Sequence, residues 1–265
     1  MLSARSGAGE ACGLRWLAVA MSSPAPVSSN RSSIFRWLVR WRLAAALLLL
    51  GAIPLGAGVA RVVGLAAGVP VTAENARFFA SPAPVVLHVF GAVTLCVLGA
   101  FQLTPALRRR KPGWHRAAGR IALLGGVLAG LSGLWMTLFY PAQPEDGRIL
   151  LVLRLLFGTA MLACLGLGFA EARRRRFARH GVWMVRAYAI GMGAGTQALL
   201  HLPWVFLVGP PGRGSHAFLM GAGWVINLAA AEWVFTRRTG SGRTAAETQP
   251  RTYSGSSTQP AMQSR

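Results

Sequence analysis

The chain has 265 residues, of which 53% are hydrophobic and only 13% are charged. Because about a quarter of the residues in a typical soluble domain are charged, this composition excludes an ordinary soluble fold. In a soluble protein, the formal net charge of +21 would indicate nucleic-acid binding. Here the basic residues flank long apolar stretches, so we expect a lipid bilayer with anionic headgroups as the partner, and no nucleic acid.

Six apolar stretches follow one another along the chain, each near the ~20 residues that a helix needs to cross a bilayer. They cover residues 43–60, 85–103, 121–140, 149–170, 182–202 and 217–235. Backbone that faces lipid must satisfy its hydrogen bonds within its own segment, so these spans must be helices. The sequence therefore predicts an all-α, polytopic integral membrane protein, a bundle of six transmembrane helices.

Arginine clusters fall only at every second gap between the stretches, and this alternation predicts the orientation. The segments on one side of the membrane carry 20 Lys and Arg residues, whereas those on the other side carry 4. The positive-inside rule makes the basic side cytoplasmic, with both termini on that side. Arg far outnumbers Lys, and Ala, Gly and Pro are abundant, which suggests a GC-rich bacterial genome and the inner membrane as the location.

We divide the chain into three parts. Residues 1–42 form a basic N-terminal segment for which we predict disorder, and Met21 is an alternative start. Residues 43–235 form the six-helix transmembrane domain, and a short interfacial helix is expected around residues 74–79. Residues 236–265 are rich in Ser, Thr, Gly and Gln without an apolar pattern, which predicts a disordered cytoplasmic tail.

Small residues line one face of the third and of the fifth predicted helix. The two faces hold Gly119, Ala122, Gly126, Ala129, Gly130 and Gly133, and Ala187, Gly191, Ala194, Gly195 and Ala198. Faces of this kind let helices approach closely in lipid, where apolar burial gives little drive to associate. We therefore predict that the third and fifth helices pack against each other; room for a flat cofactor is the alternative.

The histidines are the most informative polar residues of the spans. His88 lies near the outer end of the second helix, and His201 lies at the outer end of the fifth. His115 and His180 lie at the inner ends of the third and fifth helices. Each histidine either caps a helix or hydrogen-bonds a carbonyl, or it is a ligand of a metal ion or of haem b.

A single cytoplasmic-side site is the simplest ligand arrangement. His115 and His180, together with Glu171 or Glu232, would make a two-histidine, one-carboxylate set suited to iron or zinc. We predict that the ring nitrogens of the two histidines lie within about 5 Å of each other or within reach of one ion. No nucleophile elbow, phosphate loop, HExxH motif or dinucleotide fingerprint occurs, so the sequence assigns no catalytic residue.

Three sequence boxes resemble a known family. The first runs from His88 to Gln102, the second is the HRAAGR run at 115–120, and the third is the HGVWMVRAYA run at 180–189. In this order they resemble a bacterial family of predicted membrane proteins catalogued as domain of unknown function 2306. The matching positions are His88, Gln102, His115, Arg116, Gly119, Arg120, His180, Trp183, Met184, Arg186 and Tyr188. Gln197 stands where the resemblance implies an arginine, His201 is not part of the family pattern, and the family name implies no activity.

Two functions compete on this sequence. The first is a redox or metal- or haem-binding membrane protein that uses His115 and His180, with His88 as a further ligand. The second is a non-enzymatic small-molecule or lipid-interacting membrane protein, either a carrier or a structural protein. In the second case Arg116, Arg120 and Arg186 would bind anionic lipid headgroups, and the histidines would be structural. The substrate and the oligomeric state do not follow from the sequence.

Overall fold

The computed structural model describes residues 30–247, with side chains for residues 41–105 and 107–235. Every regular element in this range is an α-helix, which confirms the all-α fold class. The expectations for residues 1–29, including the alternative start at Met21, and those for residues 248–265 lie outside the described range. By its internal contacts the chain divides into a unit that ends at Trp41 and a unit that begins at Arg42, and the helix bundle belongs to the second.

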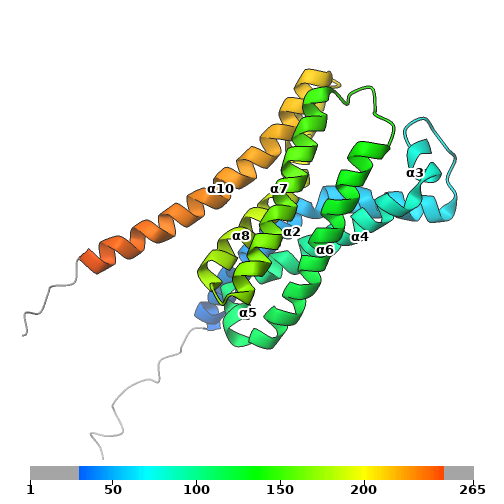
Figure 1. The fold of residues 1–265 in the computed structure, drawn as a ribbon. Helices are drawn as coiled ribbons and strands as arrows, with labels where there is room; N and C mark the ends of the chain where they lie inside the picture. The colour runs from blue at the N-terminus through cyan, green and yellow to red at the C-terminus, as the bar shows by residue number, and fades with distance from the viewer. Residues whose placement is uncertain (1–29, 248–265) are drawn as a thin grey trace, which may run out of the picture. The chain divides into compact units, whose positions relative to one another are not determined.

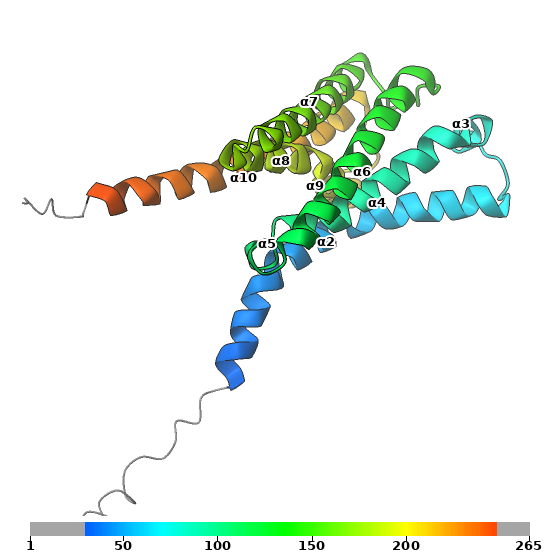
Figure 2. The ribbon, with the colours of Figure 1, turned by 60° about the horizontal axis from the view of Figure 1, so that its bottom comes forward.

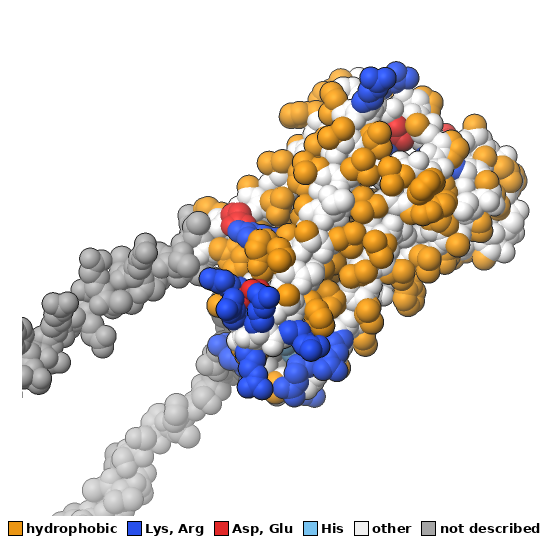
Figure 3. Space-filling model, viewed as in Figure 1, with side chains coloured by type: hydrophobic (Ala, Val, Ile, Leu, Met, Phe, Trp, Pro, Cys, Tyr) orange, Lys and Arg blue, Asp and Glu red, His pale blue; other side chains and the backbone are white. Residues whose placement is uncertain are grey.

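Five of the described helices are long and apolar enough to cross a membrane. They are α2 (Asn30–Ala67), α4 (Pro82–Gln102), α6 (Pro112–Phe139), α7 (Arg148–Arg173) and α10 (Arg213–Glu247). Many of their large apolar side chains are exposed on the bundle surface, as the lipid-facing side chains of a membrane protein must be. The space-filling view shows this apolar surface, with Lys and Arg side chains gathered at one end of the bundle (Figure 3). The chain is therefore a polytopic membrane protein.

The fifth predicted span is broken in the structure. Residues 182–202 fall on two helices of 15 residues each, α8 (Phe177–Gly191) and α9 (Gly193–Leu207), which meet at Met192. Glycines flank this residue on both sides, and glycine weakens a helix because it loses the most backbone freedom on ordering. Neither half has the length of a transmembrane helix on its own, so the count of six spans stays a prediction.

Two short helices lie outside the spans. Helix α3 (Ala76–Ala80) confirms the short helix expected in the loop after the first span. Helix α5 (Pro105–Arg110) was not predicted, and it carries three consecutive arginines in its last turn. Helices α4, α5 and α6 all begin with proline near the first position, where the missing N–H costs no hydrogen bond.

Helices α2 and α10 run past the boundaries that we predicted for the membrane domain. Residues 30–42 belong to α2 and residues 236–247 belong to α10, although we predicted disorder for both segments. Residues 30–42 contain neither Pro nor Gly, so nothing in that segment stops a helix. The other segment ends in alanines and a glutamate, which are good helix formers.

The predicted pairing of the third and fifth helices is wrong. Helix α6 packs along α4 and α7, and α8 packs along α7 (Figures 1 and 2). Helices α4 and α6 approach closely at Gly91 of α4, where an added Cβ would lie 2.6 Å from the carbonyl oxygen of Gly125 and 2.7 Å from the amide nitrogen of Ala129. The small face of α6 therefore meets α4, which has small residues of its own at the crossing.

Candidate functional site

A partly open cavity of about 600 Å³ lies in the second unit and is lined by α2, α3, α4, α6, α7, the α8–α9 pair and α10. Apolar side chains form most of its wall, among them Val89, Leu95, Leu134, Met161 and Trp224. Glycines and alanines of the surrounding helices supply the free space. The volume falls in the range of sites that bury a drug-sized molecule.

The break between α8 and α9 forms one wall of the cavity. Tyr188, Gly191, Met192, Gly195 and Gln197 all line it. At the break the backbone hydrogen bonds shift, since the amide of Gly195 donates to the carbonyl of Met192 at 3.0 Å, three residues back. Irregular backbone at membrane depth is tolerated where it is covered by protein or lines a cavity, and both conditions hold here.

Asn227 of α10 joins the two halves of the broken helix. Its Nδ2 donates to the carbonyl oxygen of Ala189 at the end of α8, at 3.2 Å. Its Oδ1 accepts a hydrogen bond from the hydroxyl of Thr196 in α9, at 2.7 Å. Beside it, the buried Gln197 donates from Nε2 to the carbonyl oxygen of Met220, at 2.9 Å. Polar side chains of α9 and α10 thus satisfy backbone groups around the break.

His88 lies in the cavity wall with a defined tautomer. Its Nδ1 is 2.9 Å from the carbonyl oxygen of Ala129. Because a carbonyl only accepts, Nδ1 carries the proton, and Nε2 of the neutral ring keeps its lone pair. The ring fits beside Gly133, where an added Cβ would lie 3.2 Å from its Cε1. His88 thus faces the inside of the bundle, between α4 and α6.

Tyr188 of the third sequence box is held inside the bundle. Its hydroxyl donates to the carbonyl oxygen of Cys96, at 3.0 Å. Its ring occupies the space that the missing side chain of Gly99 leaves, since an added Cβ there would lie 2.3 Å from the ring. Trp183 and Met184 of the same box pack on Gly168 of α7. The box therefore fixes α8 against α4 and α7.

One end of the cavity is charged. Arg61, Arg77 and Arg154 line it together with Phe78 and Tyr140. The guanidinium groups of Arg61 and Arg77 lie over the ring of Phe78, with their Cζ atoms 4.4 Å and 4.8 Å from the ring centroid. Tyr140 packs edge-on against the same ring and donates its hydroxyl to the carbonyl oxygen of Ser81, at 2.6 Å. We call this group the arginine mouth; it consists of Arg61, Arg77, Phe78, Tyr140 and Arg154.

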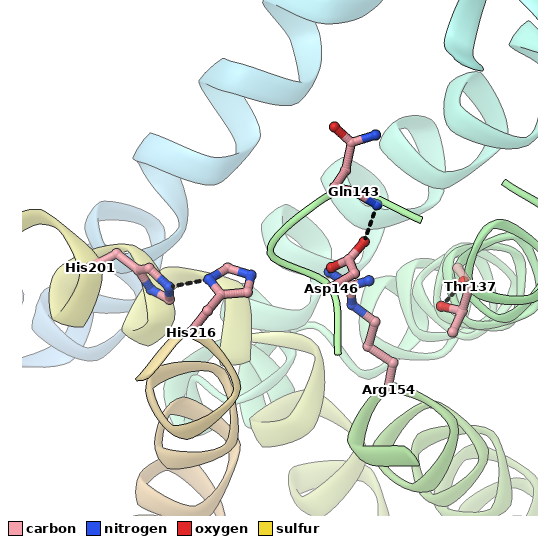
Figure 4. A network of polar contacts seen from close by, with 7 residues as sticks. Thr137, Gln143, Asp146, Arg154, His201 and His216 are labelled. Carbon is pink, nitrogen blue, oxygen red and sulfur yellow. Dashed lines mark hydrogen bonds and ion pairs between the residues drawn. The ribbon is translucent and has the colours of Figure 1, made fainter. Parts of the chain in front are cut away.

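Among the described residues, the carboxylate of Asp146 forms an ion pair with the arginine mouth. Asp146 forms an ion pair with Arg154 at 2.9 Å and accepts a hydrogen bond from the backbone N–H of Gln143 at 3.1 Å (Figure 4). Burial alone would raise the pKa of Asp146. The hydrogen bonds from Arg154 and Gln143 and the charges of Arg154 and Arg77 outweigh burial and hold the pKa below its ordinary value.

His201 and His216 point toward each other near this end (Figure 4). Nε2 of His201 is 3.0 Å from Nδ1 of His216, and Nδ1 of His201 is 2.8 Å from the carbonyl oxygen of Gln197. The carbonyl fixes the proton of His201 on Nδ1, so in the neutral pair His216 donates and His201 accepts. The structure thus pairs His201 of α9 with His216 of α10.

The predicted metal ligands lie at the opposite end and do not form one cluster. His115 and His180 are close enough to interact electrostatically. His180 directs Nδ1 at the carbonyl oxygen of Gly168, at 2.8 Å. His88 lies far from both, since its contact Ala129 is 14 residues from His115 along α6, roughly 21 Å at 1.5 Å per residue.

Both candidate carboxylates are engaged with arginines. Glu232 accepts two hydrogen bonds from Arg186, at 2.5 Å and 3.1 Å. Glu171 lies 3.9 Å from both Arg174 and Arg176. Within the described part of the chain, no group of three or more His, Cys, Asp or Glu side chains could hold a metal ion. Metal or haem binding therefore stays a sequence prediction that this geometry does not support.

The three arginines predicted to bind lipid headgroups differ in their exposure and in their partners. Arg116 and Arg120 are exposed on α6 at the basic end, where they can contact lipid. Arg186 is committed to Glu232, and its guanidinium also lies over the ring of Trp183, with Cζ 4.9 Å from the centroid. The sequence analysis assigned Arg77, Arg154 and Asn227 to no site. Polar residues within or beside apolar stretches were the available signal.

Together these features define the chain as a polytopic α-helical membrane protein with an internal cavity at a broken helix. Residues 85–235 match the model of the family described as "Predicted membrane protein (DUF2306)", and the chain belongs to this family. The match confirms the resemblance seen in the three boxes, and it begins after α2 and α3. No curated protein and no solved structure shows significant similarity to the chain.

Proposed function

We propose that the protein binds a small molecule with a long apolar chain inside its membrane bundle, as a binding protein or carrier. The observation that supports this most is the cavity of about 600 Å³ beside the broken helix. Its apolar wall matches an acyl or isoprenoid chain better than a soluble metabolite. Many membrane carriers form their substrate sites at discontinuous helices of this kind, where irregular backbone lines the site.

The small residues of the helices have two roles in the bundle. Where Gly91 and Gly125 meet, they bring α4 and α6 into backbone contact. In the cavity wall, Gly133 makes room for the ring of His88. Because helix bundles are otherwise close-packed, a partly open cavity of this size between the helices is a candidate site for an occupant.

The test is binding of a fluorescent probe with an apolar chain, the methyl ester of pyrenedodecanoic acid, to the detergent-purified protein. Ala92 lines the cavity, so Ala92→Trp should fill it and abolish saturable binding. Leu87→Trp is the matched control, because Leu87 lies on the same helix, is 45% exposed and does not line the cavity. Equal binding by both variants and the wild type would contradict the proposal.

We propose further that the basic end of the bundle lies in the cytoplasm of a bacterial cell, with both termini there and six membrane crossings. The α8–α9 pair together supplies the crossing that neither half supplies alone. Arg116 and Arg120 would then contact anionic headgroups of the inner leaflet. Reporter fusions after Arg148 and Arg213 should report the periplasm, and fusions after Lys111 and Arg176 the cytoplasm. A swapped pair would overturn this orientation.

A further inference from the structure

We infer that the arginine mouth binds an oxyanion headgroup, a phosphate or carboxylate, of the molecule whose chain occupies the cavity. This inference rests on the proposed function, because it assigns the second half of the same ligand. The proposed headgroup site depends on α2, which carries Arg61, and on α3, which carries Arg77 and Phe78. Both helices lie outside the residues that match the family model.

The first step is the charge at the mouth. Three guanidinium groups line it, and Asp146 pairs with only one of them, Arg154. The ion pairs found among the described residues include neither Arg61 nor Arg77. Arg61 is exposed, whereas Arg77 is half-buried beside the apolar wall of the cavity. Positive charge that has lost water and has no carboxylate partner is costly, so an anion would relieve that cost chiefly at Arg77.

The second step is the state of Arg77. Its Nε is buried and has no hydrogen-bond partner in the structure. Burial lowers the pKa of Arg77 below its ordinary value, and the charges of Arg61 and Arg154 lower it further against the opposing effect of Asp146. An arginine stays protonated through such a shift, so this donor requires an acceptor. Buried donors without partners are rare, and each calls for an explanation such as a ligand.

The third step is that the donors are held in place. Phe78 is only 5% exposed, and both free guanidinium groups lie over its ring. Tyr140 holds the other side of this arrangement through its ring contact and its hydrogen bond to Ser81. Planar guanidinium groups fixed in this way match the oxygens of a phosphate or carboxylate, which they can bind in pairs.

The fourth step is the position of the mouth. The same cavity runs from these arginines to the break at Met192, so one molecule can place its charged group on Arg61 and Arg77 and its chain along Leu95 and Met161. A free inorganic phosphate would use the arginines and leave the apolar wall uncovered. The shared chemistry is the oxyanion, and the size of the cavity favours an amphipathic source over a free ion.

The experiment compares pyrenedodecanoic acid with its methyl ester, two probes that differ only in the charge of the headgroup. The acid should bind the wild type more tightly than the ester. Arg61→Gln and Arg77→Gln should each weaken binding of the acid roughly tenfold or more, because each removes a charge-assisted hydrogen bond. Binding of the ester should stay unchanged, which also shows that each variant is folded.

Arg148→Gln is the control for loss of positive charge at this end, because Arg148 is exposed and does not line the cavity. It should leave the affinity for the acid unchanged. Competition by inorganic phosphate distinguishes the source. Displacement only by the amphipath supports a lipid-like ligand, and displacement by millimolar phosphate supports the same oxyanion site with the free ion as its occupant.

Equal affinity of the wild type for acid and ester, with no effect of Arg61→Gln or Arg77→Gln, would overturn the inference and leave the cavity proposal standing. The absence of saturable binding of either probe to the wild type would overturn the cavity proposal itself. The two failures are therefore distinguishable in one set of titrations.

Discussion

Asn227 donates a hydrogen bond to the carbonyl oxygen of Ala189, at 3.2 Å, across the interface between α10 and α8. This carbonyl lies in the last turn of α8, where the helix ends at Gly191 and leaves acceptors without the usual partner. The side chain of Asn227 also accepts from Thr196. One residue therefore connects both halves of the break that forms the cavity wall.

We expect Asn227→Leu to lower the thermal stability of the detergent-purified protein, by about 1 kcal/mol, which is the size of interhelical hydrogen bonds in membranes. It should cost more than Thr196→Val, which removes only one of the two contacts. Differential scanning fluorimetry of the three proteins checks this. If Thr196→Val were as damaging as Asn227→Leu, the bond to Ala189 would contribute nothing.

Gly91→Ala should destabilise the bundle by about 1–3 kcal/mol, because the new methyl group would meet the backbone of α6, which cannot rotate away. Gly166→Ala is the matched control. An added Cβ there meets nothing within 4 Å, so only the gain in helix propensity remains. Thermal unfolding in detergent should therefore order the proteins Gly91→Ala, wild type, Gly166→Ala from least to most stable, and the reverse order would refute the close contact.

Arg175 lies in the turn between α7 and α8 with φ at 58°, in the left-handed region that favours glycine. The amide of Arg176 bonds the carbonyl of Glu171 and that of Arg175 bonds Ala172, the pattern of a helix end that normally carries glycine at this point. Arg175→Gly should be more stable than Arg175→Ala by about 1 kcal/mol, since both lose the same charge and only glycine relieves the backbone. Equal melting temperatures would show that the turn is unstrained.

The ion pair of Asp146 predicts a dependence of stability on pH. Although burial opposes it, the hydrogen bonds and charges around Asp146 lower its pKa in the folded state. A carboxyl whose folded pKa is depressed stabilises the fold above its unfolded pKa, about 3.9, and loses this contribution as pH falls through the folded value. Melting temperatures of the wild type should therefore fall below about pH 4 more steeply than those of Asp146→Asn. Identical curves would mean that the pair contributes nothing to folding.

The sequence predicted the fold class and the positions of five of the six proposed spans, because a bilayer imposes a length and a composition on each helix. It did not predict the break at Met192. The surrounding glycines and alanines are equally compatible with a packing groove. The interruption is seen only in the structure, where α8 ends at Gly191, α9 begins at Gly193 and the amide of Gly195 bonds the carbonyl of Met192. The helix pairing failed for a related reason, since a small face allows close approach without specifying the partner.

The candidate site was largely beyond sequence reasoning. Arg61, Arg77 and Arg154 come from three different helices, and nothing in their spacing along the chain brings them together. The histidine boxes drew attention to His115 and His180, but in the structure the ring of His180 is engaged by the backbone carbonyl of Gly168. His216, the partner of His201, has no motif around it. Residues that gather only through tertiary packing leave no local pattern.

The most direct measurement of the central claim is native mass spectrometry of the protein purified from membranes in mild detergent. We expect the wild type and Leu87→Trp to carry a bound amphipathic molecule of defined mass, and Ala92→Trp to lack it. An acidic headgroup on the released molecule would fit the arginine mouth. A wild type without any bound mass, or the same bound mass on Ala92→Trp, would contradict a ligand in the cavity.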